Sequence, residues 1–320
     1  MDKKRARSRW WTLEGSKRRD AILAYLQEGS TSEHDLLEST AKTEEGLLDL
    51  RGLAFGDGIE LEGVQFRETD FSYSDFGRGI FRKCTFERVL FKETDSHRWN
   101  ERGCQFTDVD FYKANLRDAG IGIDGSAYIR ASFRETNFSG ASFIRPQFIA
   151  CDFSDARLKK IDFNVSNFID CKFRGKLESV WFRRYYPLPH ATGGYHGDEH
   201  HFGKAVPNEM RNVDFSEASL WDVTFTGGLD LSQVILPRDG FHVLFRHFDI
   251  ALTKAKQTLS TLQWSDEEKK EATITIESFL VHAQNQPMWI LNTKEILAEL
   301  GDLRGKEFVA MLSRFDAGDD

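Results

Sequence analysis

Large apolar residues recur at every fifth position through the middle of the chain. Steps of five from Leu61 reach Ile121 with two polar exceptions, slip by two, and run unbroken from Tyr128 to Phe173. The period returns after a gap at Phe215. Altogether 26 of 28 slots are apolar, and they hold 18 of the 27 Phe residues. A period of five matches neither the 3.6 of a helix nor the 2 of a strand. It predicts a chain that turns a corner every five residues and buries its core by stacking coils.

The residues before each slot follow a pattern as well. The position two before it is small or β-branched, as at Thr69, Ala114 and Cys151, and the next is often Asp or Asn. Stretches such as TDFSYSDF, TNFSGASF and CDFSDARLKKIDF thereby resemble the motif of the pentapeptide-repeat family. The resemblance implies a mainly β fold, a right-handed four-sided parallel β-helix with twenty residues per coil. The 28 slots then correspond to seven coils, a solenoid ~34 Å long at the ~4.8 Å spacing of neighbouring strands.

The four cysteines have the spacing of this geometry. Cys84 and Cys104 are twenty residues apart, as are Cys151 and Cys171, and all four occupy the small slot. A four-sided coil places the members of each pair directly above one another. We interpret them as buried, reduced thiols, with a redox switch or a metal site as the alternative.

Two short breaks interrupt the repeat. The slots at Ser96 and Glu101 are polar although the length is kept, which favours a local bulge with Trp99 filling the space. The alternative is an exposed Trp99 between two arginines. The second break, Gly120–Ser126, contains the glycines of a turn and predicts a corner extension.

A long insertion separates Phe173 from Phe215. The segment 177–211 contains prolines and glycines that exclude long regular structure, together with residue types enriched in interface hot spots. One interpretation is a partner-binding loop, and the other is a loop whose aromatic residues pack back on the solenoid wall. The candidate partner-binding residues are Trp181, Arg183, Arg184, Tyr185, Tyr186 and Tyr195.

Histidines are concentrated in the same insertion, which raises the hypothesis of a metal site. Their spacing matches no established zinc pattern and no Cys is nearby, so a surface His-rich turn is the favoured interpretation. The candidate metal ligands are His190, His196, His200 and His201.

The N-terminal region, residues 1–49, lacks the period of five. Residues 1–19 carry eight Lys/Arg against two Asp/Glu, and we interpret this stretch as a solvated, disordered tail. The alternative is contact of this tail with nucleic acid or an anionic membrane, and it is the only route by which we expect direct nucleic-acid binding. The segments 16–28 and 32–42 predict two short helices.

The solenoid, residues 50–236, is followed by a region with helical periodicity, residues 237–320. Apolar spacing predicts a first helix over 241–262, and a capping box at Ser265–Glu268 begins a second. Two shorter helices are expected near Thr293–Leu300 and Lys306–Phe315. Because a solenoid ends in an open strand edge that must be covered, we predict an α-helical cap.

The net charge of −8 is distributed unevenly along the chain. Residues 50–176 carry 20 Lys/Arg and 19 Asp/Glu, so the regular solenoid is nearly neutral. Pentapeptide-repeat proteins of the quinolone-resistance and toxin-immunity type resemble DNA and bind type II topoisomerases. Resemblance to a phosphate backbone requires a strong negative field, so the neutral solenoid counts against that function here.

The sequence contains no Gly-rich phosphate loop, nucleophile elbow or His-Glu-x-x-His motif, and we expect neither enzymatic activity nor a cofactor. The leading hypothesis is a scaffold that binds a protein partner through the insertion and a helical end. The alternative is a DNA mimic that binds a type II topoisomerase, and a weaker alternative is a metal-binding protein. We further expect a cytoplasmic protein with no membrane association, and a homodimer through the C-terminal helices as an additional option.

Overall fold

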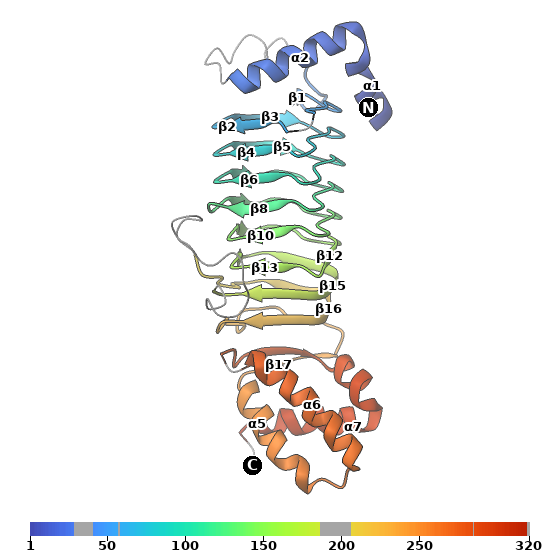
Figure 1. The fold of residues 1–320 in the computed structure, drawn as a ribbon, viewed down its shortest axis with the longest axis vertical. Helices are drawn as coiled ribbons and strands as arrows, with labels where there is room; N and C mark the ends of the chain where they lie inside the picture. Colours follow the sequence, from blue (N-terminus) through green and yellow to red (C-terminus); the bar gives the residue numbers. More distant parts are fainter. Residues whose placement is uncertain (29–40, 57, 186–205, 284, 319–320) are drawn as a thin grey trace.

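The computed structural model describes residues 1–28, 41–56, 58–185, 206–283 and 285–318. The chain forms an elongated rod in which parallel coils are stacked along the long axis (Figure 1). Helices lie across the N-terminal end of the rod, and a second helical unit lies at the other end. The predicted β-solenoid of about seven turns, with helical regions at both ends, is confirmed.

Each coil contributes one strand to each of two long parallel ladders. Neighbours in a ladder are about one coil apart in sequence, so that Phe66 pairs with Phe86 and Phe86 with Phe106. The first ladder contains β2 (Glu60–Glu62), β4 (Ile80–Arg82), β6 (Asn100–Arg102), β8 (Gly120–Ile123), β10 (Ser142–Ile144), β13 (Asp162–Asn164), β15 (Lys172–Arg183), β12 (Leu158–Lys159) and β16 (Asp214–Thr226). The second contains β1 (Leu48–Asp49), β3 (Gln65–Asp70), β5 (Thr85–Leu90), β7 (Gln105–Thr107), β9 (Ala127–Ile129), β11 (Gln147–Ile149) and β14 (Asn167–Ile169).

The other two sides of each coil are joined by single bridges rather than by strands. Asp75 pairs with Asp95 on one side, and Leu90 pairs with Asp110 on the other, and the same pattern continues up the rod. Four pairing positions per coil of about twenty residues define the four-sided cross-section.

Left-handed backbone conformations mark the corners. The residue two positions after a slot has a positive φ even where it is not glycine, as at Glu68 (46°), Lys83 (53°) and Arg88 (56°). Each such residue costs free energy. The cost is tolerated because every corner presents its backbone groups to the coils above and below, where they form hydrogen bonds.

Aromatic rings fill the interior in continuous stacks. Along one side, Phe86, Phe106 and Tyr128 lie nearly parallel, with ring centroids 4.7 and 4.4 Å apart. A second stack on the next side begins at Phe71 and ends at Phe215. Such pairs contribute roughly 0.5–1.5 kcal/mol each beyond the apolar area that they bury. The core of one coil is therefore completed only by its neighbours.

The cysteines occupy small inward positions, as predicted. All four are buried free thiols. Each thiol lies against the carbonyl oxygen 23 residues earlier, as Cys104 Sγ does at 3.4 Å from Phe81 O and Cys171 Sγ at 3.3 Å from Phe148 O. Burial raises the pKa of Cys151 well above its usual value, which favours the unreactive thiol over the thiolate.

The two short breaks in the repeat form one structural feature. Trp99 is 1% exposed and stacks on Phe81 with 4.2 Å between ring centroids, so it fills the space beside the polar slots as predicted. Glu101 is fully buried and accepts hydrogen bonds from Gly122 N, Ser126 Oγ and, at 3.0 Å, Tyr128 Oη. The register between β6 and β8 shifts at Glu101, because Asn100 pairs with Gly120 whereas Arg102 pairs with Ile123. The glycine-rich break thus serves to place hydrogen-bond donors around the carboxyl group of Glu101.

The N-terminal residues cover the first coil, so the prediction of a disordered basic tail is wrong. They form α1 (Lys3–Ser8), a 3-10 turn (Arg9–Trp11) and α2 (Leu13–Glu28). Trp10 is buried, and its Nε1 donates to Arg51 O at 2.8 Å. Arg9 Nη2 donates to Asp49 Oδ1 and to two backbone carbonyls of the first coil. These contacts use basic residues to close the open end. Of the predicted helix 32–42, residues 32–40 lie outside the described part of the chain.

The C-terminal unit mixes helices with a two-stranded sheet. It contains β17 (His242–Phe245), α5 (Phe248–Thr258), a 3-10 turn (Leu259–Thr261), α6 (Asp266–Ala283), β18 (Trp289–Asn292) and α7 (Thr293–Asp316). The prediction of helix from 241 is wrong for residues 242–245, because this apolar run pairs antiparallel with β18. The two helices expected after residue 293 are the two halves of α7, kinked at Gly301 (φ 73°).

Glu101 is expected to make stability depend on pH. Its burial raises the pKa from 4.5 to about 7, so the folded chain keeps a proton that the unfolded chain has released. The resulting stability is fully present below pH 4.5, falls as pH rises through 7, and amounts to about 3 kcal/mol. Urea unfolding of wild type and of Glu101→Gln from pH 5 to 8 measures this, and the variant should lose that part of the slope. The exposed control Glu44→Gln should keep it, and equal slopes for all three proteins contradict the assignment.

Gly52 is expected to be required for the N-terminal cap. A Cβ there would lie 2.4 Å from the backbone of Ala6, whereas one at Gly56 would meet nothing within 4 Å. Both glycines have similar positive φ, 74° and 77°, so Gly52→Ala and Gly56→Ala carry equal backbone strain and differ only in the clash. Limited trypsin digestion should cleave α1 at least several-fold faster in Gly52→Ala alone. Equal cleavage rates in the two variants would show that the cap does not depend on this close approach.

Candidate interaction site at the solenoid–helix junction

The insertion begins later than its sequence predicts. β15 continues through Leu177 to Arg183, and Leu177 and Phe182 are buried in the core as two further slots. Leu177 lies four residues after Phe173 rather than five, so a search with a fixed period of five does not find it. The segment expected to be a loop from residue 177 is therefore strand as far as residue 183.

Trp181 and Arg183 point outward from β15, because Phe182 between them points inward. The Arg183 guanidinium lies 4.4 Å from the centre of the Trp181 ring, and its Nε is 2.9 Å from both carboxylate oxygens of Asp162. His282 of α6 packs against the same tryptophan in a T-shaped arrangement, with 5.0 Å between ring centroids. The solenoid wall and the C-terminal unit thus share one surface. Burial lowers the pKa of His282, which favours its neutral form.

Arg184 and Tyr185 follow at the point where the chain leaves the coil. Arg184 Nη1 donates to Gly228 O at 2.7 Å, and its guanidinium lies 5.2 Å from the Tyr185 ring centre. Tyr185 is 52% exposed. The chain rejoins the solenoid at Met210, which is buried where an apolar slot is needed.

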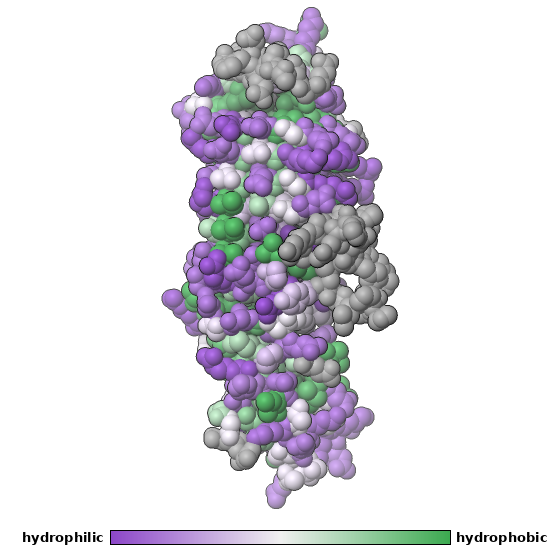
Figure 2. Space-filling view, turned by 90° about the vertical axis from the view of Figure 1, so that its left-hand side faces the viewer, coloured by the Kyte–Doolittle hydropathy of each residue, from purple (hydrophilic) through white to green (hydrophobic). Residues whose placement is uncertain are grey.

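Four of the six predicted partner-binding residues, Trp181, Arg183, Arg184 and Tyr185, therefore lie in the described part of the chain at the end of β15. Tyr186 and Tyr195 lie outside the described residues, as do His190, His196, His200 and His201. In the described part of the chain, no group of three or more His, Cys, Asp or Glu is arranged to hold a metal ion. On the side shown in Figure 2, hydrophilic residues predominate, with apolar residues gathered in the middle coils and near the helical end.

Side chains of the C-terminal unit bind the open backbone of the last coil. Gln286 is buried, and its amide both accepts from Leu229 N (2.7 Å) and donates to Leu229 O (2.9 Å). Asn292 Nδ2 donates to Leu220 O at 2.7 Å. His242 Nδ1 lies 2.9 Å from Asp239 Oδ1, and its Nε2 lies 3.3 Å from Leu220 N and 3.2 Å from Leu220 O. These amide and imidazole groups take the place that a further coil would occupy.

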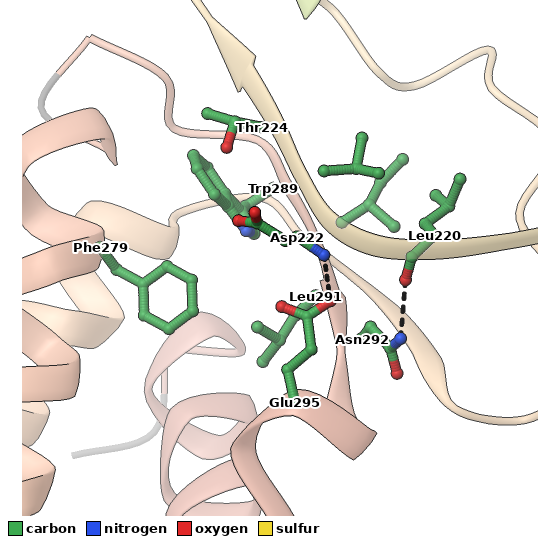
Figure 3. Close-up of a pocket in the computed structure, with 10 residues that line it drawn as sticks. Leu220, Asp222, Thr224, Phe279, Trp289, Leu291, Asn292 and Glu295 are labelled. Atoms are coloured by element: carbon green, nitrogen blue, oxygen red, sulfur yellow. Dashed lines mark hydrogen bonds between the residues drawn. The ribbon is translucent and has the colours of Figure 1, made fainter. Parts of the chain in front are cut away.

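Glu295 belongs to the same contact (Figure 3). It accepts from Asp222 N at 2.8 Å, and burial raises its pKa to about 7. A cavity of about 30 Å³ lies beside it, between β16, β18 and the helices. That volume accommodates about one water molecule, so the cavity is too small for a substrate. We assign this carboxyl group to closure of the solenoid.

The charges on the solenoid surface are largely paired between neighbouring coils. Glu68 pairs with Arg88, Asp108 with Arg130 and Lys172 with Glu217, in each case across coils. Exposed pairs of this kind contribute little to stability, roughly 0–1 kcal/mol each. Their main effect is on the electrostatic field of the surface, because adjacent opposite charges cancel the negative field that an acidic face would have.

The architecture is that of a four-sided parallel β-helix. It has four pairing positions per coil, one inward apolar residue on each side and a register of about twenty residues. The chain has the pentapeptide-repeat fold. Among the described residues, no helix has both the length and the apolar character needed to cross a membrane.

Comparison with known proteins gives structural likeness without close sequence relatives. No protein-family model and no curated protein matches the chain. HetL, a pentapeptide-repeat protein involved in heterocyst differentiation regulation from the cyanobacterium Nostoc, aligns over 60% of this chain and 89% of its own, with 18% identity and a TM-score of 0.25.

Two other solved structures show a similar or weaker likeness. For full-length QnrB1, a plasmid-mediated fluoroquinolone resistance protein, the values are 57% and 92% coverage, 18% identity and a TM-score of 0.21. A pentapeptide-repeat protein of the Arabidopsis thaliana thylakoid lumen covers 47% of this chain and 66% of its own, with 17% identity and a TM-score of 0.12. These likenesses concern the fold alone.

Gln286 is expected to be a main anchor of the helical unit. The substitution Gln286→Met keeps the volume but leaves both backbone groups of Leu229 without their partner, which should cost about 2–4 kcal/mol of unfolding free energy. The matched control is Gln257→Met, at an exposed position of α5, which should change stability by less than about 0.5 kcal/mol. Urea unfolding provides the measurement. A Gln286→Met variant as stable as the control would show that the last coil does not need this amide.

Proposed function

We propose that this protein is a non-enzymatic scaffold that binds a protein partner through the junction between the solenoid and the helical unit. The junction surface consists of Trp181, Arg183, Tyr185, Val281 and His282. The observation that carries the proposal is the contact between Trp181 and His282, which joins the base of the insertion to α6.

The composition of the junction surface supports recognition of a protein. Tyr185 is 52% exposed, and Val281, next to His282 on α6, is 71% exposed. Trp, Tyr and Arg are the residue types that most often carry binding energy in interfaces. Arg183 is held by Asp162 and stacked on Trp181, so little conformational entropy would be lost when a partner binds.

The alternative, a DNA mimic that binds a type II topoisomerase, has less support. The described solenoid presents carboxylates whose charge is offset by lysines and arginines of adjacent coils, as at Glu60 with Arg82 and Glu62 with Lys83. Imitation of a DNA phosphate backbone needs an uncompensated negative field. Capture of a topoisomerase in the experiment below would support this alternative.

Affinity capture from host lysate with matched variants tests the proposal. The test variant combines Tyr185→Ala with Val281→Asp, and both residues are exposed, so the fold should be retained. The control combines Trp11→Ala with Leu13→Asp, which are 83% and 77% exposed at the other end of the rod. We expect a protein captured by wild type and control to be reduced at least about tenfold with the test variant, the equivalent of about 1.4 kcal/mol.

Two results would overturn the proposal: no protein enriched by wild type, or partners retained equally by the test variant. A topoisomerase captured by all three proteins would instead establish the alternative. Sedimentation velocity on the same samples tests the predicted homodimer through the C-terminal helices.

A further inference from the structure

A second pocket lies beside the two points where the insertion leaves and rejoins the solenoid. It has a volume of about 240 Å³, which is enough for a small polar group, and its lining includes Arg184, Asn208, Arg211, Asp230 and Gln233. These residues come from three separate segments of the last coils. The pocket is distinct from the small cavity at Glu295.

Asn208 presents a buried donor with no acceptor. Its side-chain oxygen accepts from Phe168 N at 3.2 Å and from Met210 N at 3.1 Å, and these two backbone donors fix the orientation of the amide. The residue is 2% exposed, and its Nδ2 is buried without a hydrogen-bond partner. Buried polar atoms almost always have a partner, so this amide nitrogen indicates a missing acceptor.

Arg184 supplies a second donor of the same kind. One of its terminal nitrogens is engaged by Gly228 O at 2.7 Å, which holds the guanidinium in place. Its Nε is buried and also lacks a partner. Two residues that line one pocket therefore each hold a buried donor without an acceptor, and one of these donors is cationic.

The charges around the pocket limit the ligand. Arg184 and Arg211 contribute two positive charges, whereas Glu209 and Asp230 contribute two negative ones, and Arg211 is already 3.3 Å from Glu209. A dianionic phosphate would be repelled by the two carboxylates. A group with one negative charge and two acceptor oxygens fits the donors better.

We propose that this pocket binds a carboxylate group, which accepts hydrogen bonds from Asn208 Nδ2 and Arg184 Nε. The carboxylate belongs either to a small organic acid or to an acidic side chain or C-terminus of a protein. The site rests on its own two donors and does not require the junction surface to bind a protein.

Sodium acetate is the probe for the first experiment. Titration of the full-length isotope-labelled protein is followed through the NMR signals of the Asn208 amide and the Arg184 Nε–H, with sodium chloride and acetamide as controls. The variant Asn208→Asp keeps the oxygen that the two backbone amides need but replaces the donor with an anionic oxygen. Arg184→Lys keeps the charge and the bond to Gly228 but has no Nε–H, and it serves if Asn208→Asp fails to fold.

We expect saturable NMR shifts with acetate and none with the controls. In either variant, the remaining donor should respond to acetate at least tenfold more weakly, while the melting temperature stays unchanged. Linear shifts that chloride reproduces, or saturation unaffected by either variant, would overturn the proposal. The capture experiment with Asn208→Asp then identifies the source. Loss of the partner assigns the carboxylate to the protein, and a partner retained while acetate binding is lost assigns the pocket to a small organic acid.

Discussion

Hydrogen bonding between coils is the constraint on which this structure depends. Every coil satisfies its backbone through the coils above and below, so the first and last coils each have one unsatisfied edge. At the N-terminal edge, Arg9 and Trp10 bond to backbone oxygens of the first coil. At the other edge, Gln286 and Asn292 replace a missing strand with side-chain amides. Both ends of the chain are thus explained by the same requirement.

The candidate function follows from how the second edge is closed. A helical unit held on the last coil by buried hydrogen bonds does not rotate freely, so Trp181 of β15 and His282 of α6 keep a fixed relation. A rigid surface assembled from two structural units has a more distinctive shape for a partner to recognise than the repetitive wall of the solenoid has. The insertion leaves the coil beside this surface, and the pocket proposed to bind a carboxylate is lined by residues at the same point.

The sequence predicts the solenoid well because the residues that point into the core are determined by spacing within a few neighbouring residues. Small and large residues alternate at fixed spacing, and the cysteines confirm the coil length independently. It predicts less where contacts join distant segments. Ser126 and Tyr128 reach Glu101 because they lie about one coil after it in the sequence. Neither break in the repeat reveals this contact when it is considered alone. Likewise, the four-residue step to Leu177 hides two further core positions of β15, Leu177 and Phe182. His242–Phe245 becomes a strand only because β18 pairs with it.

Amide hydrogen exchange of the full-length protein shows whether the helical unit closes the last coil. The backbone amides of Leu220, Asp222 and Leu229 donate hydrogen bonds to side chains of that unit. We predict that they exchange as slowly as amides of the middle coils, such as that of Phe111. Rapid exchange at these three positions, beside slow exchange in the middle coils, would show an open end and a helical unit that is not held in place.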